Sequence, residues 1–205
     1  LDFDATDIPL HGDQPEKFFH GYYDHYCYLP LYVFCDRFPL VAYLRQSNID
    51  GAKHTAAILK LLVSFIRSHW PTVRIIFRGD SGFCRQLILN WCDRNGVDYI
   101  VGIARNPRLE ALVEPLWGFV EQQHSQRKAQ GHSGSTKAFW RYQYQAKSWR
   151  YARDVIAKAE LTDKGTNPRF VVTSLRGNDR SLYYDLYCAR GDMENRIKDQ
   201  QLDLF

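Results

Sequence analysis

Residues 73–82 read VRIIFRGDSG, a short apolar run that leads directly into an acidic turn. The run at 73–77 predicts a buried strand, and the glycines around Asp80 predict that the strand ends there. In open α/β sheets, ligands bind beyond the ends of strands, so Asp80 is a candidate ligand-binding residue. An aspartate in such a turn more often caps a helix or forms the turn, and this alternative stays open.

The segments on either side of this stretch predict alternating helices and strands. Upstream, apolar residues at intervals of three and four predict a helix over 51–69 that ends at Trp70-Pro71. Downstream, residues 83–95 predict a second helix closed by Gly96, and residues 97–103 a further strand. The stretch therefore lies inside an α/β unit.

The N-terminal residues predict strands. Residues 1–6 alternate in polarity, so Asp2 and Asp4 share one face of a strand. The aromatic and β-branched segments 26–34 and 39–45 predict a hairpin. With the segments above, the order is β-β-β-α-β-α-β, which predicts an α/β protein with a mixed sheet flanked by helices.

The remaining chain predicts an insertion followed by a helix. Residues 109–123 favour a helix and 125–136 an exposed loop, while the last helix covers 179–199. Three strands are expected between them, at 138–145, 153–161 and 169–175. We interpret the chain as the first part of a core (1–105), an insertion subdomain that is largely β (106–178) and a core helix (179–205).

Composition sets broad limits on the function. The chain has 205 residues, 45% hydrophobic and 24% charged, which is typical of a soluble globular domain. A net charge of +4 is compatible with a polyanionic partner but does not establish one. No apolar stretch approaches the roughly 20 residues of a membrane span, and no leader is evident. We expect a cytoplasmic bacterial protein without a membrane partner.

The ends of the sequence and its cysteines give two further expectations. The chain begins at Leu1 rather than Met and stops in mid-pattern at Leu204-Phe205, so we interpret it as a fragment truncated at both ends. The five cysteines contain no C-x-x-C pair, so we expect buried free thiols rather than a zinc site or disulfides.

Three carboxylates from distant parts of the chain are candidates for a metal site. Asp4 lies in an apolar strand, where an aspartate is disfavoured unless it is paired or bound. Asp80 follows a strand, and Glu194 lies on the last helix. Hard divalent ions take such oxygen ligands, and enzymes of phosphoryl transfer often hold two ions between carboxylates.

Each carboxylate also has another interpretation. Glu194 is equally compatible with a solvated helix position, paired with Arg190 or Lys198 at i±4 spacing. Asp2 and Asp7 are rivals to Asp4, because all three occur near the first strand. Residue types and spacing alone do not choose among them.

Three segments together resemble the signature regions of bacterial insertion-sequence DDE transposases. They are Asp4-Ala5-Thr6, the stretch RGDSGF at 78–83, and Tyr187-x2-Arg190-x3-Glu194-Asn195. The third is the most specific, because it resembles the signature around the catalytic glutamate in one large branch. Segments GYYDHY at 21–26, NIDG at 48–51 and ENRIK at 194–198 agree with it, and the resemblance covers nearly the whole chain.

This resemblance implies a fold, a chemistry and partners. The fold is a ribonuclease-H-like mixed sheet flanked by helices, with a mainly β insertion between the second aspartate and the glutamate. The chemistry is strand cleavage at transposon ends and strand transfer into target DNA, supported by two Mg²⁺ ions, for which Mn²⁺ substitutes. The partners are double-stranded DNA, both terminal repeats and target, and further copies of the chain in the DNA complex.

The resemblance also implies roles for individual residues. Asp4, Asp80 and Glu194 would be the catalytic, metal-binding triad, and the Asp-x-Thr pattern favours Asp4 over Asp2. Tyr187 and Arg190 would contact DNA phosphates. The fuller family pattern has a lysine seven residues after the glutamate, but that position is Gln201 here, so the nearest lysine, Lys198, is the candidate for this DNA contact.

Two other functions remain open at this point. One is a nuclease of the same fold without strand transfer, because metal carboxylates alone do not separate hydrolysis from joining. The other is an inactive DNA-binding remnant. Basic and aromatic residues also alternate over 127–153, which suits either a DNA-contacting surface or an ordinary β-hairpin, and the aromatics of 20–32 favour packing over base stacking.

Overall fold

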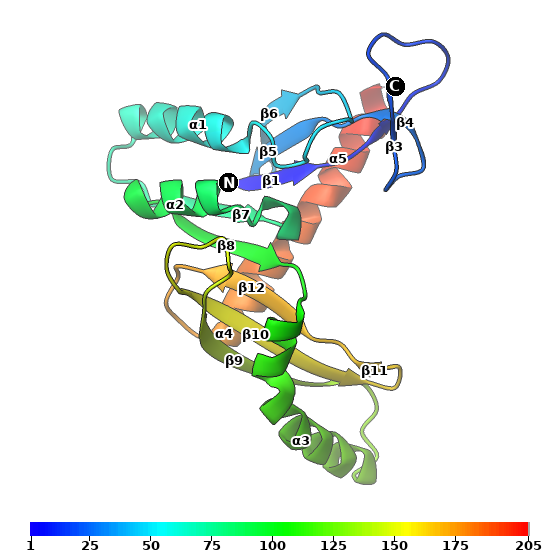
Figure 1. The fold of residues 1–205 in the computed structure, drawn as a ribbon, viewed down its shortest axis with the longest axis vertical. Coiled ribbons are helices and arrows are strands. Elements are labelled where there is room, and N and C mark those ends of the chain that lie inside the picture. Colours follow the sequence, from blue (N-terminus) through cyan, green and yellow to red (C-terminus); the bar gives the residue numbers. More distant parts are fainter. Residues whose placement is uncertain (205) are drawn as a thin grey trace.

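The structure is a computed structural model that describes the chain from Leu1 to Leu204, except for the side chains of Glu194 and of residues 200–204. Within this part, a nine-stranded mixed sheet forms the centre (Figure 1). Its order is β11-β10-β12-β8-β7-β1-β5-β6, and β9 pairs with β10. The strands are β1 (Asp2–Ala5), β5 (Leu31–Cys35), β6 (Phe38–Tyr43), β7 (Ile76–Gly79), β8 (Asp98–Ile103), β9 (Thr136–Tyr144), β10 (Arg153–Thr162), β11 (Gly165–Thr166) and β12 (Arg169–Thr173).

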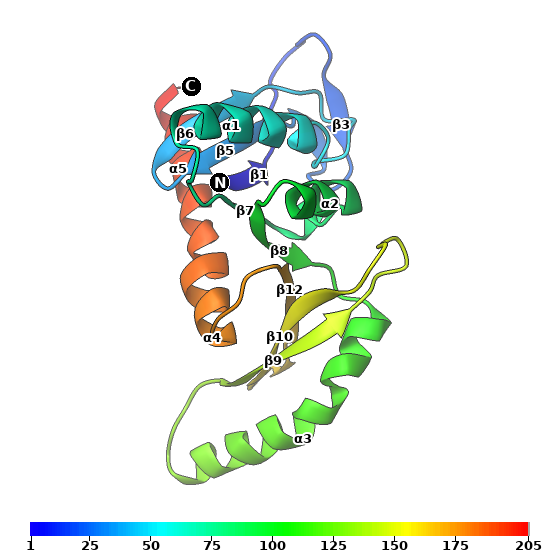
Figure 2. The same ribbon diagram turned by 90° about the vertical axis from the view of Figure 1, so that its left-hand side faces the viewer.

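Helices cover both faces of this sheet. On one face lie α1 (Thr55–His69), α2 (Gln86–Arg94) and α3 (Pro107–Ala129). On the other face runs a continuous helical path, α4 (Asp179–Ser181), the π-helical turn η2 (Leu182–Tyr187), η3 (Cys188–Arg190) and α5 (Gly191–Leu204). Figure 2 shows α5 and α2 on opposite sides of the strands. The predicted mixed α/β architecture is therefore confirmed.

Alternation along the strands explains these layers. In β1, Phe3 is fully buried and packs on Phe77, with ring centroids 5.0 Å apart. Burying a side chain of this size stabilises the fold by about 1.5–3 kcal/mol. On the opposite face, Met193 and Ile197 of α5 are buried against Tyr32 and Phe34 of β5. The C-terminal helix is therefore anchored across the first strands of the chain.

The predicted strand at 26–34 is wrong in its continuity. Leu29 and Pro30 divide it into β4 (His25–Tyr28) and β5, and β4 belongs to a separate three-stranded sheet with β2 (Ile8–Pro9) and β3 (Phe18–His20). Proline lacks the N–H that a central strand would need to continue the ladder. The small sheet consequently places the turn after β3, which carries Tyr23, beside the end of β1.

Other boundaries shift as well. The helix predicted over 51–69 begins only at Thr55, and the last predicted helix contains a π-helical turn before α5. Residues 125–129, predicted as loop, continue α3. All five cysteines are free, as predicted, but Cys35 and Cys188 are exposed rather than buried.

The strands of residues 106–178 do not form a sheet of their own. β12 pairs antiparallel with β8, so β9, β10 and β12 extend the central sheet outward from the core strands. The division of the chain at 106 and 178 stays a prediction. No helix in the described part is both long and apolar enough to cross a membrane.

Candidate active site

Two neighbouring parallel strands bring the first pair of carboxylates together. β1 and β7 pair with Asp2 opposite Arg78 and Phe3 opposite Gly79. The next step of this register places Asp4 beside Asp80, which directly follows β7. Because Phe3 faces α1 and α2, Asp4 faces the side on which α5 lies.

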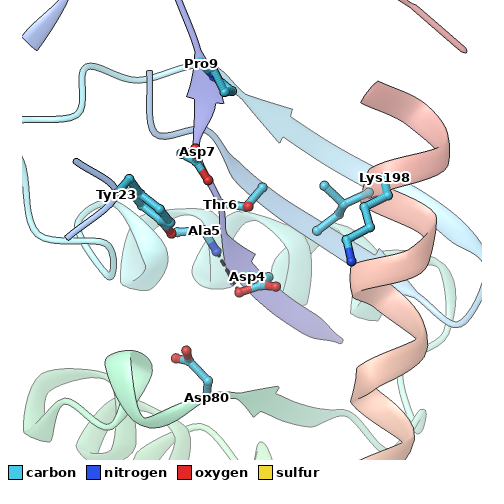
Figure 3. A pocket seen from close by; sticks show the side chains of 9 residues that line it. Asp4, Ala5, Thr6, Asp7, Pro9, Tyr23, Asp80 and Lys198 are labelled. Carbon is cyan, nitrogen blue, oxygen red and sulfur yellow. Dashed lines mark hydrogen bonds between the residues drawn. The ribbon is translucent and has the colours of Figure 1, made fainter. Parts of the chain in front are cut away.

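Asp4 and Asp80 line one cavity of about 460 Å³. In Figure 3 their carboxylates point toward one another, Asp4 from β1 and Asp80 from the turn after β7. Residues from four separate parts of the chain line this cavity. They are Asp4, Ala5, Thr6, Asp7, Pro9, Tyr23, Asp80, Ile197 and Lys198.

Backbone N–H groups orient both carboxylates. Asp80 caps the short helix η1 (Ser81–Phe83), and its Oδ1 accepts a hydrogen bond of 2.8 Å from the Gly82 N–H. Asp4 Oδ1 accepts one of 3.0 Å from the Ala5 N–H. The capping interpretation of Asp80 is thus correct, and it is compatible with a ligand-binding role because a carboxylate has four lone-pair sites.

Asp2, the rival of Asp4, is committed to an ion pair. Its side chain is 4% exposed and accepts hydrogen bonds from two nitrogens of Arg78, with Nη2 2.6 Å from Oδ2. Arg78 also donates to the Leu186 carbonyl. Asp2 does not line the cavity. Asp7 does, and its Oδ2 lies 2.7 Å from His25 Nε2.

Two cations approach the cavity from the C-terminal helical path. Arg190 is 12% exposed, and its Nη1 lies 4.0 Å from Asp4 Oδ2. That Nη1 is buried without a hydrogen-bond partner among the described residues. Lys198 extends from α5 toward the cavity (Figure 3). Both predicted DNA-contacting cations therefore lie beside the carboxylates.

Tyr187 reaches the other side of the Asp80–Ser81 peptide. Its hydroxyl fits over Gly102 of β8, where an added Cβ would lie 2.6 Å from Tyr187 Oη and 2.9 Å from the Ser81 nitrogen. Burial raises the pKa of Tyr187, and the Asp80 carboxylate adds to the rise against the opposing effect of Arg190. The phenol therefore stays protonated and able to donate a hydrogen bond near neutral pH.

Glu194 lies within α5, but its side chain is outside the part of the chain that the structure describes. Among the described side chains, no group of three or more His, Cys, Asp or Glu residues is placed to hold a metal ion. Asp4 and Asp80 nevertheless supply the oxygen donors that hard divalent ions take, and they do so from one cavity. Their chemistry fits such an ion.

Tyr23 is a cavity residue that the interpretation of the sequence missed, since its segment was assigned to packing. Its pKa is raised to about 12 by burial first and then by Asp7 and Asp4. Asp24, with φ 58°, forms the turn that directs Tyr23 inward while Tyr22 is 85% exposed. The segment 21–26 was part of the family resemblance, and that signal pointed to it.

Two arginines in the basic and aromatic stretch 127–153 make structural contacts. Arg141 contacts Asp154 and Asp179, and Arg153 donates to Asn90, Asp93 and Tyr99. These contacts favour the hairpin interpretation for both arginines.

This chain is similar to one known protein family and to one solved structure. A family described as "Transposase DDE domain group 1" matches residues 1–205. Among solved structures, a chain of the piggyBac transposase synaptic complex with hairpin DNA is similar, with a TM-score of 0.48 and 9% identity. The similarity covers 96% of this chain and 39% of that chain, so this chain spans well under half its length. No curated protein shows a significant sequence match.

Proposed function

The chain belongs to the transposase DDE domain family, and on this premise we propose that it carries the catalytic centre of a DNA transposase. The proposed activity is cleavage at transposon ends followed by strand transfer into target DNA. One observation carries it: Asp4 and Asp80, from adjacent strand ends, face a single cavity flanked by Arg190 and Lys198.

The proposed fold type is ribonuclease-H-like, with residues 106–178 as the insertion. The strand order β6-β5-β1-β7-β8 supports it, since β6, β5 and β1 are antiparallel neighbours and β1, β7 and β8 are parallel. The helices on both faces agree with this arrangement.

DDE transposases use divalent metal ions, and we assign their binding here to Asp4, Asp80 and Glu194, with two Mg²⁺ ions replaceable by Mn²⁺. Arg190 and Lys198, four residues before and after Glu194, both lie at the cavity. Residues at this spacing share a helix face, which supports the choice of Glu194 as third ligand. Bound there, such ions would stabilise charge on the reacting phosphate and lower the pKa of water.

The chain's own side chains would position the DNA. Arg190 and Lys198 offset the negative charge of the backbone at the cut site, and the protonated Tyr187 hydroxyl donates a hydrogen bond to the backbone near that site. Asp4 and Asp80 are held in place by backbone N–H groups, so little reorganisation is needed when substrate binds. Double-stranded DNA as partner, assembly of several copies around it and a bacterial cytoplasmic location are parts of the same proposal.

The decisive experiment is Asp80→Asn in the full-length enzyme. Asparagine keeps the size and the Gly82 hydrogen bond but loses the charge, so Mg²⁺-dependent cleavage of transposon ends should disappear while end binding stays measurable. Asp163→Asn is the matched control, since this exposed carboxylate pairs only with Lys128 among the described residues. Cleavage retained by Asp80→Asn would refute the assignment.

A joining assay separates transposase from nuclease. A pre-cut DNA end with a free 3′-hydroxyl, incubated with a target plasmid, should be covalently joined to it. Hydrolysis products without joined DNA would favour a nuclease of the same fold.

A further inference from the structure

A second, smaller pocket lies across the Asp80–Ser81 turn from the carboxylate cavity. Its volume is about 130 Å³. It opens where β8 ends and β12 begins, and its lining is Ser81, Gly102, Ile103, Ala104, Arg105, Arg169, Phe170, Tyr183 and Tyr187. We call it the arginine notch. None of its described lining residues is acidic.

Two guanidinium groups give the notch its charge. Arg105 follows β8 and Arg169 begins β12, and both are exposed. Neither forms an ion pair with a carboxylate in the described part of the chain, whereas Arg141 and Arg153 of the neighbouring strands do. The positive charge in the notch is therefore available to a ligand.

Arg105 is held in position by a neutral partner. Its Nη2 donates to Asn167 Oδ1 at 2.9 Å. Asn167 Nδ2 in turn donates to Glu160 Oε2 at 2.9 Å, and Glu160 is fixed by Lys158 at 2.7 Å. An amide orients the guanidinium without neutralising it, and arginine has five N–H donors, so others remain for a ligand.

The walls of the notch add neutral donors and a close backbone approach. The Tyr187 hydroxyl lies over Gly102, beside the Ser81 nitrogen, in space that any side chain at Gly102 would fill. Cationic forks with hydroxyl donors and no carboxylate match a phosphate diester.

The geometry points to the arginine notch as the seat of a DNA phosphate next to the scissile one, with Arg105 and Arg169 as its ligands. This inference rests on the proposed function, because it places the strand that enters the Asp4–Asp80 cavity across Ser81. Asn167 acts as a positioning residue for Arg105. The contact is to the backbone, so it adds affinity without sequence preference.

Salt-dependent DNA binding tests the notch. The full chain with Arg105→Ala and Arg169→Ala is compared with wild type by titration with a short DNA duplex in Ca²⁺, which suppresses cleavage. Loss of one phosphate contact should lower the slope of log affinity against log salt by about one. The matched control is Arg94→Ala with Arg127→Ala, in the last turns of α2 and α3, and its slope should change less.

Phosphate neutralisation locates the contact. A methylphosphonate at the phosphate beside the scissile position should weaken wild-type binding but add little in the double variant, because the charge that it removes has lost its partner. Asn167→Ala keeps both arginines, so the slope of log affinity against log salt should stay close to the wild-type value. Because Arg105 is then less well positioned, the methylphosphonate beside the scissile position should weaken binding less than it does in the wild type. Thermal melting of each variant confirms that it is folded.

The outcomes separate the two proposals. Wild-type protein that binds no DNA refutes the proposed function and this inference with it. Wild-type protein that binds DNA, with an unchanged slope and unchanged methylphosphonate profile in the double variant, refutes the notch alone. If the control variant lowers the slope by the same amount, the notch is also refuted, because the loss of any two arginines would then have this effect.

Discussion

The two ends of the β1–β7 pair differ in charge although they belong to the same strands. At the start of the pair, Asp2 lies opposite Arg78, and the two side chains form a buried ion pair. Two residues further along, at the other end, Asp4 lies beside Asp80, and both are acidic. Opposite charges in register stabilise a sheet, whereas like charges destabilise it unless a cation lies between them. The difference separates a structural pair from a ligand-binding pair.

Removing the charge of Asp4 should have the largest effect. Asp4→Asn keeps the Ala5 hydrogen bond, so the stability should change by less than about 1 kcal/mol. Cleavage should fall by at least about 10³-fold, because a lost metal ligand removes several kcal/mol of charge stabilisation. Single-turnover cleavage in Mg²⁺ measures it. If a folded Asp2→Asn enzyme lost more cleavage activity than Asp4→Asn, Asp2 rather than Asp4 would be the metal ligand.

Removing the partner of Asp2 should mainly affect stability. Arg78→Met leaves a buried, unpaired carboxylate, and the free energy of unfolding should fall by about 3–5 kcal/mol. Urea denaturation measures it. Adding Asp2→Asn should recover much of the loss, because no charge is then buried. If the double variant is as unstable as Arg78→Met, packing rather than charge explains the effect.

A methyl group at Gly102 should test how tightly the turn at Asp80 is packed. Gly102→Ala places Cβ 2.6 Å from Tyr187 Oη and 2.9 Å from the Ser81 nitrogen, so the protein should lose about 1–3 kcal/mol of stability. Gly118→Ala is the control, since nothing lies within 4 Å of a Cβ in that α3 position. There, helix propensity predicts a gain of up to about 1 kcal/mol. Equal effects would argue against close packing at Gly102.

The smallest expected effect is on the pH dependence of stability. It concerns Glu160, which accepts a hydrogen bond from Asn167 beside the arginine notch. Burial alone would raise the pKa of Glu160, but hydrogen bonds from Lys158, Ser135 and Lys137 outweigh it and lower the pKa to about 2. Because this pKa is depressed in the folded state, its stabilisation is present above the ordinary value of 4.5 and is lost as pH falls toward 2. Glu160→Gln should flatten the stability profile in this range, measured by denaturation at successive pH values. If the stability of Glu160→Gln falls with pH as steeply as that of the wild type, other carboxylates cause the loss of stability in acid.

Much of the fold follows from periodicity. The helices near α1, α2 and α3 and the strands near β7, β8, β10 and β12 were predictable, because a buried face repeats every 3.6 residues in helices and every two in strands. The split of 26–34 into β4 and β5 was not, since apolar alternation continues through Leu29-Pro30 while hydrogen bonding does not. The small sheet that brings Tyr23 to the cavity depends on that break.

By itself, the sequence determined the α/β order, the family resemblance and the candidates Asp4, Asp80, Arg190 and Lys198, because local patterns and motifs are written along the chain. Only the tertiary structure decided that Asp2 is occupied by Arg78, that Asp4 and Asp80 meet in one cavity, and that Arg105 and Arg169 form a notch beside them. The reason is physical. Whether a carboxylate meets an arginine or another carboxylate depends on the strand register, and register joins residues some 76 positions apart.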